Sequence, residues 1–218
     1  MSAPVSLAGR RVIVSAGPTF EDIDPVRFIG NRSSGKMGFA VAAVAAQRGA
    51  QVVLVAGPVA LATPEGVQRV DVRSAAQMHD AVIAALPAAV YIGAAAVADY
   101  RPVQVAPGKI KKHDGRLTLE LVRTLDILAD VAAHALRPRL LVGFAAETDN
   151  IVGYARGKLE KKKLDMIVAN RVGIAGSGFE SDDNTLTVFW TGGERTLGPA
   201  SKTELANGLL DLIAERLT

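Results

Sequence analysis

The residues best suited to do chemistry lie in the segment 24–38, which reads DPVRFIGNRSSGKMG and directly precedes an apolar run. The first N–H groups of a helix lack intrahelical partners and bind anions, and glycine lets a phosphate come close to them. Lys36 would add a positive charge, and Ser33 or Ser34 would cap the helix. The segment therefore fits an anion site at a helix start, although a solvated, serine-capped loop fits these residue types equally well.

Charged side chains farther along the chain suit the same kind of ligand. Lys158 and Lys162 stand four residues apart in a predicted helix, so two like charges share one face and repel each other unless an anion lies between them. Their place near the helix C-terminus, where the helix dipole favours cations, is the simpler explanation. Basic groups, helix-start N–H groups and a few carboxylates together favour a polyphosphate bound with a divalent cation. The candidate groups are Arg27, Asn31, Ser33, Lys36, Asp99, Lys109, Asp126, Lys158 and Lys162.

Other chemistries find less support in the sequence. The chain has no cysteine, and its histidines, His79, His113 and His134, fall mid-helix, in a turn and near a helix end, which favours structural roles. A P-loop, a GxGxxG turn after the first strand, an HExxH motif and any Cys/His metal spacing are all missing. Tyr154 and Lys158 match the YxxxK pair of short-chain dehydrogenases, but without the glycine-rich dinucleotide turn a dehydrogenase remains only an alternative.

The composition is that of a globular α/β protein. Of 218 residues, 49% are hydrophobic, 22% are charged and only 5% are aromatic, which suits small side chains packed between helices and a parallel sheet. The net charge of +3 is too small for a nucleic-acid footprint and fits a small anionic ligand. The sequence shows neither a membrane-spanning apolar run nor an N-terminal signal. We therefore expect a soluble, cytoplasmic protein with no nucleic-acid or membrane partner.

Strand and helix patterns alternate through the first hundred residues. The predicted elements are a strand over 12–17, a polar, proline-containing loop to about residue 33, a helix over 34–48 closed by Gly49, strands over 51–57 and 68–72, a helix capped by Ser74 and an apolar strand that runs into a loop over 89–99. This alternation predicts a Rossmann-like α/β fold, an open, mostly parallel sheet with helices on both faces, in a single domain over 1–218. Such sheets bind ligands at the C-terminal ends of their strands, here 16–19, 56–58 and 94–99.

The stretch 100–122 breaks this alternation. Its KIKKHDGRLTLELV string alternates as two strands around the turn 113–115, which predicts a β-hairpin flap with Lys109, Lys111 and Lys112 crowding the first strand. Core elements follow. They are a helix from Thr124 or Asp126 to about His134, a strand over 140–148, a helix over 150–164, a strand over 165–170, a glycine-rich loop to Asn184, a terminal hairpin and a last helix capped by Ser201.

Several long strings are specific enough to suggest a family. The chain contains, in this order, SAGPTFEDIDPVRFIGNRSSGKMG, AAAVADYRP, KIKK, GFAAET and KLEKKKLDMIVAN. Together they resemble phosphopantothenate–cysteine ligase, which in most bacteria is the C-terminal half of a bifunctional coenzyme A biosynthesis protein. The resemblance implies a two-step reaction. The carboxylate of 4′-phosphopantothenate attacks the α-phosphate of CTP to give an acyl-cytidylate and pyrophosphate, and the amine of L-cysteine then displaces CMP.

The resemblance also implies roles for positions in this chain. Arg27 and Asn31 match the family's VR…N pair, in which the asparagine acts on the acyl-cytidylate, and Lys109 belongs to the KIKK string of a closing flap. These three residues are expected to be catalytic. The expected CTP contacts are Asp99, Lys109, Leu125 (where many relatives have proline), Asp126, Ile127, Leu128, Phe144, Lys158 and Lys162. The expected contacts to phosphate or substrate are Gly17, Ser33, Ser34, Gly35, Lys36 and Ala96.

Cofactors and partners follow from the same resemblance. Mg²⁺ is expected with CTP, held through its phosphates and through Asp99 or Asp126, and no site made of protein side chains alone is expected. No FMN is expected, because the flavin-dependent decarboxylase half is absent from the sequence. A homodimer, and a decarboxylase domain or protein as partner, are also implied. The motifs favour CTP over ATP, which some relatives use. A non-catalytic nucleotide-binding module, in which CTP binds without turnover, remains a further alternative.

Overall fold

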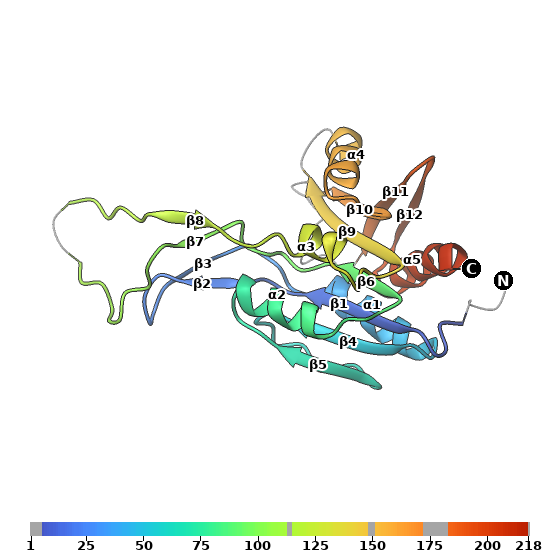
Figure 1. Ribbon diagram of the computed structural model, residues 1–218, viewed down its shortest axis with the longest axis horizontal. Helices are drawn as coiled ribbons and strands as arrows, with labels where there is room; N and C mark the ends of the chain where they lie inside the picture. Colours follow the sequence, from blue (N-terminus) through green and yellow to red (C-terminus); the bar gives the residue numbers. More distant parts are fainter. Residues whose placement is uncertain (1–5, 113–114, 148–150, 172–182, 218) are drawn as a thin grey trace.

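An eight-stranded sheet forms the centre of the protein in the computed structural model, which describes residues 6–112, 115–147, 151–171 and 183–217 (Figure 1). The strands are β1 (Arg11–Ala16), β4 (Gln51–Ala56), β5 (Val67–Asp71), β6 (Val90–Gly93), β9 (Leu140–Glu147), β10 (Met166–Arg171), β11 (Asp183–Trp190) and β12 (Gly193–Ser201). Their order in the sheet is β12-β11-β10-β9-β6-β1-β4-β5. Neighbours from β10 to β5 pair in parallel, whereas β11 pairs antiparallel with both β10 and β12.

Helices cover both faces of this sheet. The helices are α1 (Lys36–Gln47), α2 (Ala75–Ala84), α3 (Ile127–Ala133), α4 (Ile151–Lys161) and α5 (Lys202–Leu217). Successive side chains of a strand point to opposite faces. Accordingly Val12, Val14 and Ala16 of β1 join the core packed under α1 and α5, whereas Ile13 joins the core packed under α2, α3 and α4. The predicted fold class, an open, mostly parallel sheet with helices on both faces, is confirmed.

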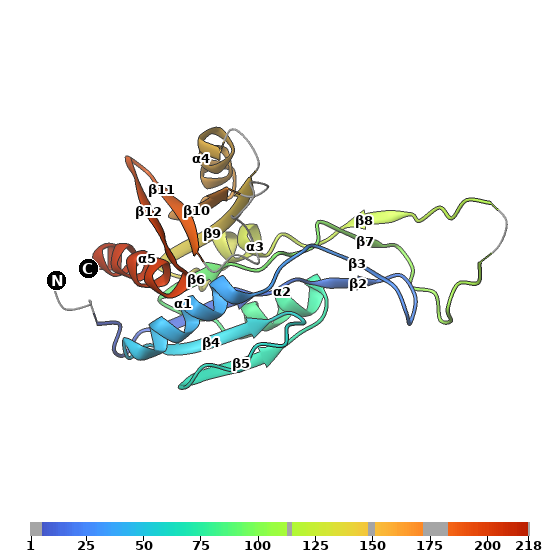
Figure 2. The ribbon, with the colours of Figure 1, turned by 180° about the vertical axis from the view of Figure 1, so that it is seen from behind.

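An arm projects from the sheet (Figures 1 and 2). It contains two antiparallel pairs, β2 (Phe20–Asp22) with β3 (Phe28–Gly30) and β7 (Tyr100–Pro102) with β8 (Leu121–Arg123). The loop predicted up to residue 33 therefore contains a β-hairpin, and that prediction is wrong in this part. The rings of Phe20 and Phe28 stack with centroids 3.8 Å apart, an apolar pair that stabilises the hairpin across its two strands.

The predicted flap strands are wrong over most of their length. Residues 103–112 and 115–120 contain no strand, so the lysines of KIKK lie on irregular chain, and the hairpin is present only at its base, β7 and β8. The predicted turn at 113–114 lies outside the described residues. The alternating pattern fails because a two-stranded ribbon needs a second layer against which to bury its apolar face, and Leu117 remains 51% exposed.

The helix caps follow the predictions at two of the three predicted serine positions. Ser74 caps α2 and Ser201 caps α5, each through a side-chain oxygen that accepts a backbone N–H. The predicted cap of α1 by Ser33 or Ser34 is wrong. Gly35 holds the N-cap position with φ 73°, and no side chain caps the helix there. Ser33 Oγ instead accepts a 3.2 Å hydrogen bond from the Gly35 N–H, which shapes the turn that leads into the helix.

Two predicted elements are longer than the observed ones. The strand predicted within 89–99 ends at Gly93, and the helix predicted over 150–164 ends at Lys161. The predicted helix start at Asn150 and the glycine-rich loop over 172–182 lie outside the described residues. Within the part of the chain that the structure describes, none of the helices has both the length and the apolar character needed to cross a membrane.

Candidate functional site

A cavity of about 930 Å³ opens at the C-terminal ends of β1, β6 and β9. Its walls include Ser15 of β1, the segment 93–97 that begins at the last residue of β6, and Phe144 of β9. β1 and β6 are neighbours, and the helices that follow them, α1 and α3, cover opposite faces of the sheet. Open α/β sheets bind ligands at such a point, because the two chains diverge there and leave a crevice.

Most of the residues predicted for the site line this one cavity. They are Asn31, Ser33, Ser34, Gly35, Lys36, Ala96, Asp99, Leu125, Asp126, Ile127, Leu128, Phe144, Lys158 and Lys162. They come from the segment before α1, from the loops after β6 and before α3, from β9, and from the C-terminal end of α4. The fold therefore brings together polar groups that are far apart in the sequence, while their individual roles stay predictions.

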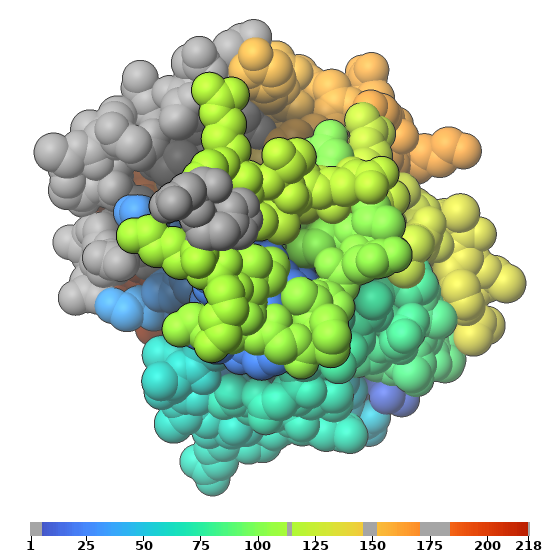
Figure 3. All heavy atoms as spheres, turned by 90° about the vertical axis from the view of Figure 1, so that its left-hand side faces the viewer, coloured from blue at the N-terminus to red at the C-terminus, as the bar shows by residue number. Residues whose placement is uncertain are grey.

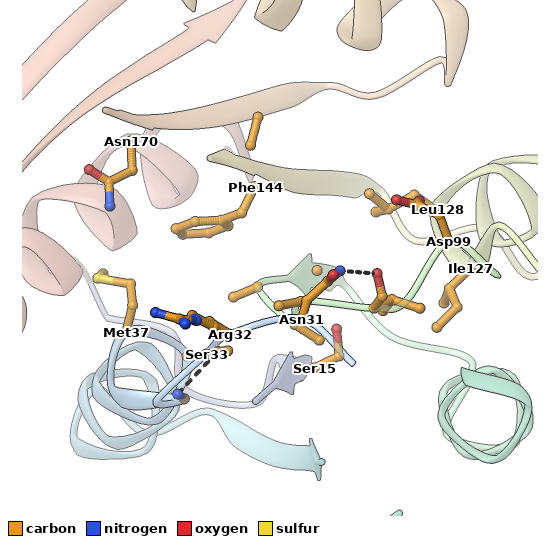
Figure 4. A pocket seen from close by; sticks show the side chains of 18 of the residues that line it. Ser15, Asn31, Arg32, Ser33, Met37, Asp99, Ile127, Leu128, Phe144 and Asn170 are labelled. Atoms are coloured by element: carbon orange, nitrogen blue, oxygen red, sulfur yellow. Dashed lines mark hydrogen bonds between the residues drawn. The ribbon is translucent and has the colours of Figure 1, made fainter. Parts of the chain in front are cut away.

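The cavity has two ends (Figure 4). Asn31, Asp99, Ile127 and Leu128 lie toward one end, where α3 begins. Arg32, Met37 and Asn170 lie toward the other, beside the start of α1 and the end of β10. Of these labelled side chains, those at the first end are a carboxylate, an amide and two aliphatic groups, whereas those at the second end are a cation, an amide and a thioether. Such an arrangement suits a long ligand, or two ligands, with more than one polar group.

Asn31 is held by a backbone carbonyl beyond the end of β6. Its Nδ2 donates a 2.8 Å hydrogen bond to the carbonyl oxygen of Val97, drawn as a dashed line in Figure 4. The loop that supplies this carbonyl is itself fixed, because the N–H of Ala98 donates to Thr19 Oγ1 over 2.9 Å. One bond thus orients the side-chain amide of Asn31 at the cavity wall, where its remaining N–H and its oxygen can bind a substrate atom.

Asp126 links the start of α3 to the end of α4. Its carboxylate accepts the Ala129 N–H over 3.2 Å, which caps α3 as predicted, and it forms an ion pair with Lys162 at 2.9 Å. The charge of Lys162 is therefore offset by a protein carboxylate. An anion between Lys158 and Lys162 is not required to relieve their repulsion, so their spacing alone does not demonstrate a phosphate site.

The two carboxylates expected to help hold Mg²⁺ differ in their availability. Asp126 is engaged by Lys162 and by the cap of α3. Asp99 is exposed, and its carboxylate has no hydrogen bond or ion pair with the residues that the structure describes. Among those residues, no three His, Asp or Glu side chains gather closely enough to hold a metal ion. The side chains thus fit a cation bound mainly through a ligand's phosphates, with Asp99 as the available protein oxygen.

Three of the predicted residues, Gly17, Arg27 and Lys109, do not line the cavity. Gly17 follows β1 directly with φ 80°, and a Cβ there would stand 3.1 Å from Val59, so it lets the chain turn at the end of β1. Lys109 belongs to the flap, which forms the far end of the arm (Figure 1) and lies in front in the end-on view of Figure 3. Arg27 pairs with Asp24 on the arm.

The sequence interpretation missed several residues of the cavity. Asn170 Oδ1 is buried and has no hydrogen-bond partner among the described residues, which suits a donor on a ligand. Arg32 and Lys202 also line the cavity. Ser15 Oγ and Tyr91 OH, 3.0 Å apart, form a buried hydroxyl pair in its wall, and burial raises the pKa of Tyr91. The rule that strand ends bind ligands would have found Asn170, which closes the apolar run of β10.

The open, mostly parallel sheet and the polar cavity at its switch point define a Rossmann-like α/β domain whose cavity has the form of a small-molecule site. Over residues 7–217 the sequence matches the family described as DNA/pantothenate metabolism flavoprotein C-terminal domain. The chain therefore belongs to this family.

Comparison with individual relatives supports the family resemblance that the motifs indicate. The chain is 54% identical over 218 residues to the coenzyme A biosynthesis bifunctional protein CoaBC of Vibrio cholerae, covering 99% of this chain and 55% of that protein. It thus spans about half the length of the curated relatives it matches. The crystal structure of the C-terminal domain of a protein CoaBC superposes with a TM-score of 0.82 at 43% identity, over 96% of each chain. A Cab2 mutant in complex with phosphopantothenate-cysteine shares the fold, with a TM-score of 0.77 and 16% identity over 95% of this chain and 87% of that one. The predicted resemblance is confirmed.

Proposed function

We propose that this chain is a CTP-dependent phosphopantothenate–cysteine ligase. One observation carries the proposal: Asn31, Asp99, the segment 125–128 and the pair Lys158 and Lys162, which the motifs connect with this reaction, line a single cavity. The family name supports a substrate of pantothenate metabolism, and the relatives' name supports coenzyme A biosynthesis. A cavity of about 930 Å³ has room for a nucleotide beside a second substrate.

The proposed reaction has two half-steps. In the first, a carboxylate oxygen of 4′-phosphopantothenate attacks the α-phosphorus of CTP, pyrophosphate leaves, and a mixed anhydride, the acyl-cytidylate, is formed. In the second, the amine nitrogen of L-cysteine attacks the acyl carbon, CMP leaves with the electron pair of the broken C–O bond, and the nitrogen loses a proton. A free carboxylate has no good leaving group, so the covalent intermediate divides one difficult step into two easier ones.

The residues of the cavity fit the charges that develop in these steps. Lys158 and Lys162 would stabilise the phosphoryl oxygens as negative charge grows on them, and fixed cations do so without reorganising at the moment of reaction. The segment 125–128 would bind the nucleotide. The side-chain amide of Asn31, oriented by its bond to Val97, would hold the acyl carbonyl oxygen while cysteine adds to the neighbouring carbon.

Mg²⁺ would supply further positive charge to the phosphate oxygens of CTP when it is bound. Asp99 is the residue we assign to it, because Asp126 is tied to Lys162. The assignment needs only one protein oxygen, since magnesium sites on nucleotides take most of their ligands from phosphates and water.

Pyrophosphate release tests the proposed function. With Mg²⁺, CTP and 4′-phosphopantothenate the protein should release pyrophosphate, and L-cysteine should allow many turnovers. The same assay with ATP measures the nucleotide preference. If neither nucleotide yields pyrophosphate, the ligase assignment is wrong. Binding of CTP without turnover would point to a non-catalytic module, and binding of NAD(P)H in a fluorescence titration would point to a dehydrogenase.

Replacing Lys162 by methionine should weaken CTP binding. The substitution removes a cation and leaves the Asp126 carboxylate unpaired beside the phosphates, so we expect kcat/KM for CTP to fall by about 10- to 100-fold, mainly through KM. Steady-state kinetics with varied CTP measures this. Lys161→Met, at the exposed last residue of α4, is the matched control and should stay close to the unaltered protein. If both variants changed kcat/KM for CTP equally, Lys162 would have no specific role in binding the nucleotide.

The proposal includes two macromolecular partners. Val26, Phe28 and Leu121 on the arm are 59%, 45% and 43% exposed, and a second copy of the chain would cover such apolar side chains. The second partner is a decarboxylase domain or protein, since the relatives are named bifunctional and are about twice as long. Sedimentation equilibrium should give the mass of a dimer, and a monomer at every concentration tested would contradict the first of these partners.

A further inference from the structure

The buried carboxylate of Asp24 lies between two parts of the arm. Its side chain has no exposed surface. It accepts hydrogen bonds from the backbone N–H groups of Val26 at 2.9 Å and Arg27 at 2.8 Å, and from the Nε of Arg27 at 3.0 Å and its Nη2. A buried charge is strongly destabilising unless it is paired and hydrogen-bonded, and here the pairing is extensive.

The same ion pair also holds the flap. Ile110 lies between Lys109 and Lys111 of the KIKK string. Its N–H donates to Asp24 Oδ2 over 3.1 Å, and its carbonyl oxygen accepts from Arg27 Nη2 over 3.0 Å. Both backbone polar groups of one flap residue are therefore bound by one ion pair. We call this arrangement of Asp24, Arg27 and Ile110 the clamp.

The clamp binds a part of the flap that is not held in place by a helix or a strand. Residues 103–112 form no strand. Among the described residues, the other hydrogen bonds that tie this segment to its surroundings come from the N–H of Val103, which donates to Glu120 at 3.0 Å, and from the N–H of Ala106, which donates to Ile23 at 2.9 Å. Of these hydrogen bonds, those of the clamp lie nearest in the sequence to the KIKK lysines.

The clamp is charged at the pH of an enzyme assay. The hydrogen bonds from Arg27 outweigh the effect of burial and hold the pKa of the Asp24 carboxyl well below its usual range. Because the pKa is lowered, the stabilisation is complete above the ordinary carboxyl value of about 4 and disappears only as the pH falls through the lowered value. Near neutral pH the carboxylate is therefore ionised and the ion pair is intact.

We propose that Asp24 is a positioning residue of the flap, which acts through Arg27 and Ile110 to fix the place of Lys109. The role of Lys109 rests on the proposed function, whereas the clamp itself does not. Arg27, which the motifs connect with catalysis, acts in this arrangement through the flap rather than by touching the substrate. When the chain around Lys109 is already fixed, placing the charge of Lys109 beside a substrate costs less conformational entropy than it would on a freely moving chain.

Hydrogen exchange of the Ile110 N–H tests the clamp without any substrate. Asp24→Asn keeps the shape of the side chain but loses its charge, so exchange should become at least about tenfold faster, the factor expected for losing one charge-assisted hydrogen bond. The matched control is Asp22→Asn. Asp22 lies on the same hairpin and pairs with an arginine, Arg73, but has no hydrogen bond to the described residues of the flap, so exchange should not change. Unchanged exchange in Asp24→Asn would overturn the proposal.

Kinetics then tests the link to Lys109. If Asp24 acts through this lysine, the losses of ligase activity caused by Asp24→Asn and by Lys109→Ala should not be additive. The double variant should then be no slower than Lys109→Ala alone. Additive losses would show that Asp24 acts elsewhere. Should Asp24→Asn not fold, Arg27→Gln offers a second route, because this half-exposed side chain donates to the Ile110 carbonyl. If the unaltered protein lacks ligase activity but Ile110 exchange responds as expected, the proposed function fails and the clamp stands.

Discussion

Replacing Asn31 by aspartate should make the acyl-cytidylate accumulate while formation of the amide product falls by about 10²- to 10³-fold, the loss typical for one donor to a developing oxyanion. The amide of Asn31 donates to the Val97 carbonyl over 2.8 Å, and an ionised aspartate has no N–H to replace this bond. Its carboxylate would instead face a carbonyl oxygen and turn away. Attack by cysteine then lacks its donor, whereas attack on CTP depends on other residues.

Rapid-quench experiments with labelled 4′-phosphopantothenate separate the two half-steps. The intermediate and the amide product are counted in the same samples, so accumulation is seen directly. Asn207→Asp serves as the control, because it makes the same chemical change on α5, where Asn207 contacts Arg48 and does not line the cavity. If both half-steps slow equally and no intermediate collects, Asn31 does not have the role we assign to it.

Gly38→Ala should reduce both stability and substrate binding. A Cβ at Gly38 would stand 2.5 Å from the Ala16 Cβ, 3.3 Å from its Cα and 3.5 Å from the Ala94 Cβ. Overpacking of this kind is typically destabilising by about 1–3 kcal/mol, which lowers the Tm by roughly 2–12 °C in a chain of this size. Since β1 is fixed in the middle of the sheet, α1 has to move. The turn over 33–36 moves with it, so KM for the phosphorylated substrate should rise.

The control for this prediction is Gly157→Ala. Gly157 lies inside α4, and outside the backbone of its own helix no described atom lies within 4 Å of the place that a Cβ would take. Alanine there should therefore be neutral or should stabilise the protein by up to about 1 kcal/mol. Calorimetry gives the Tm of each variant, and steady-state kinetics gives KM. A Gly38→Ala protein with normal Tm and normal KM would show that the close approach of α1 to β1 does not position the site.

The sheet and its helices could be predicted because each element carries its own signal. The apolar runs of β1 and β4 and the cap at Ser74 depend only on neighbours in the sequence. The arm could not be predicted in this way. Its β2–β3 hairpin depends on contacts such as the stacking of Phe20 on Phe28. The sequence around Leu117 alternates as a strand would, but within the described residues no second layer of structure covers its apolar side chains, and no strand forms there.

The residues of the candidate site also divide into those that the sequence predicts and those that depend on contacts between distant segments. Residues at strand ends, such as Ala96 and Asp99, follow from the rule for parallel sheets, and the motifs add the others. The ion pair of Asp126 with Lys162 could not be foreseen, because it joins two helices that only the sheet brings together. The clamp at Asp24 is similar: a residue between an isoleucine and a proline gives no hint that its carboxylate will hold a flap residue 86 positions away.

The flap lies outside the hydrophobic core, and this has a consequence for how relatives can diverge. Of the described residues in 103–112 and 115–120, none belongs to either buried cluster of the core. Pro102 and Leu121, which flank the flap, are cross-strand partners and lie next to each other. Insertions and deletions between them therefore leave the sheet and its cavity intact. Relatives can therefore differ in the length and charge of the flap while they inherit the same sheet and cavity.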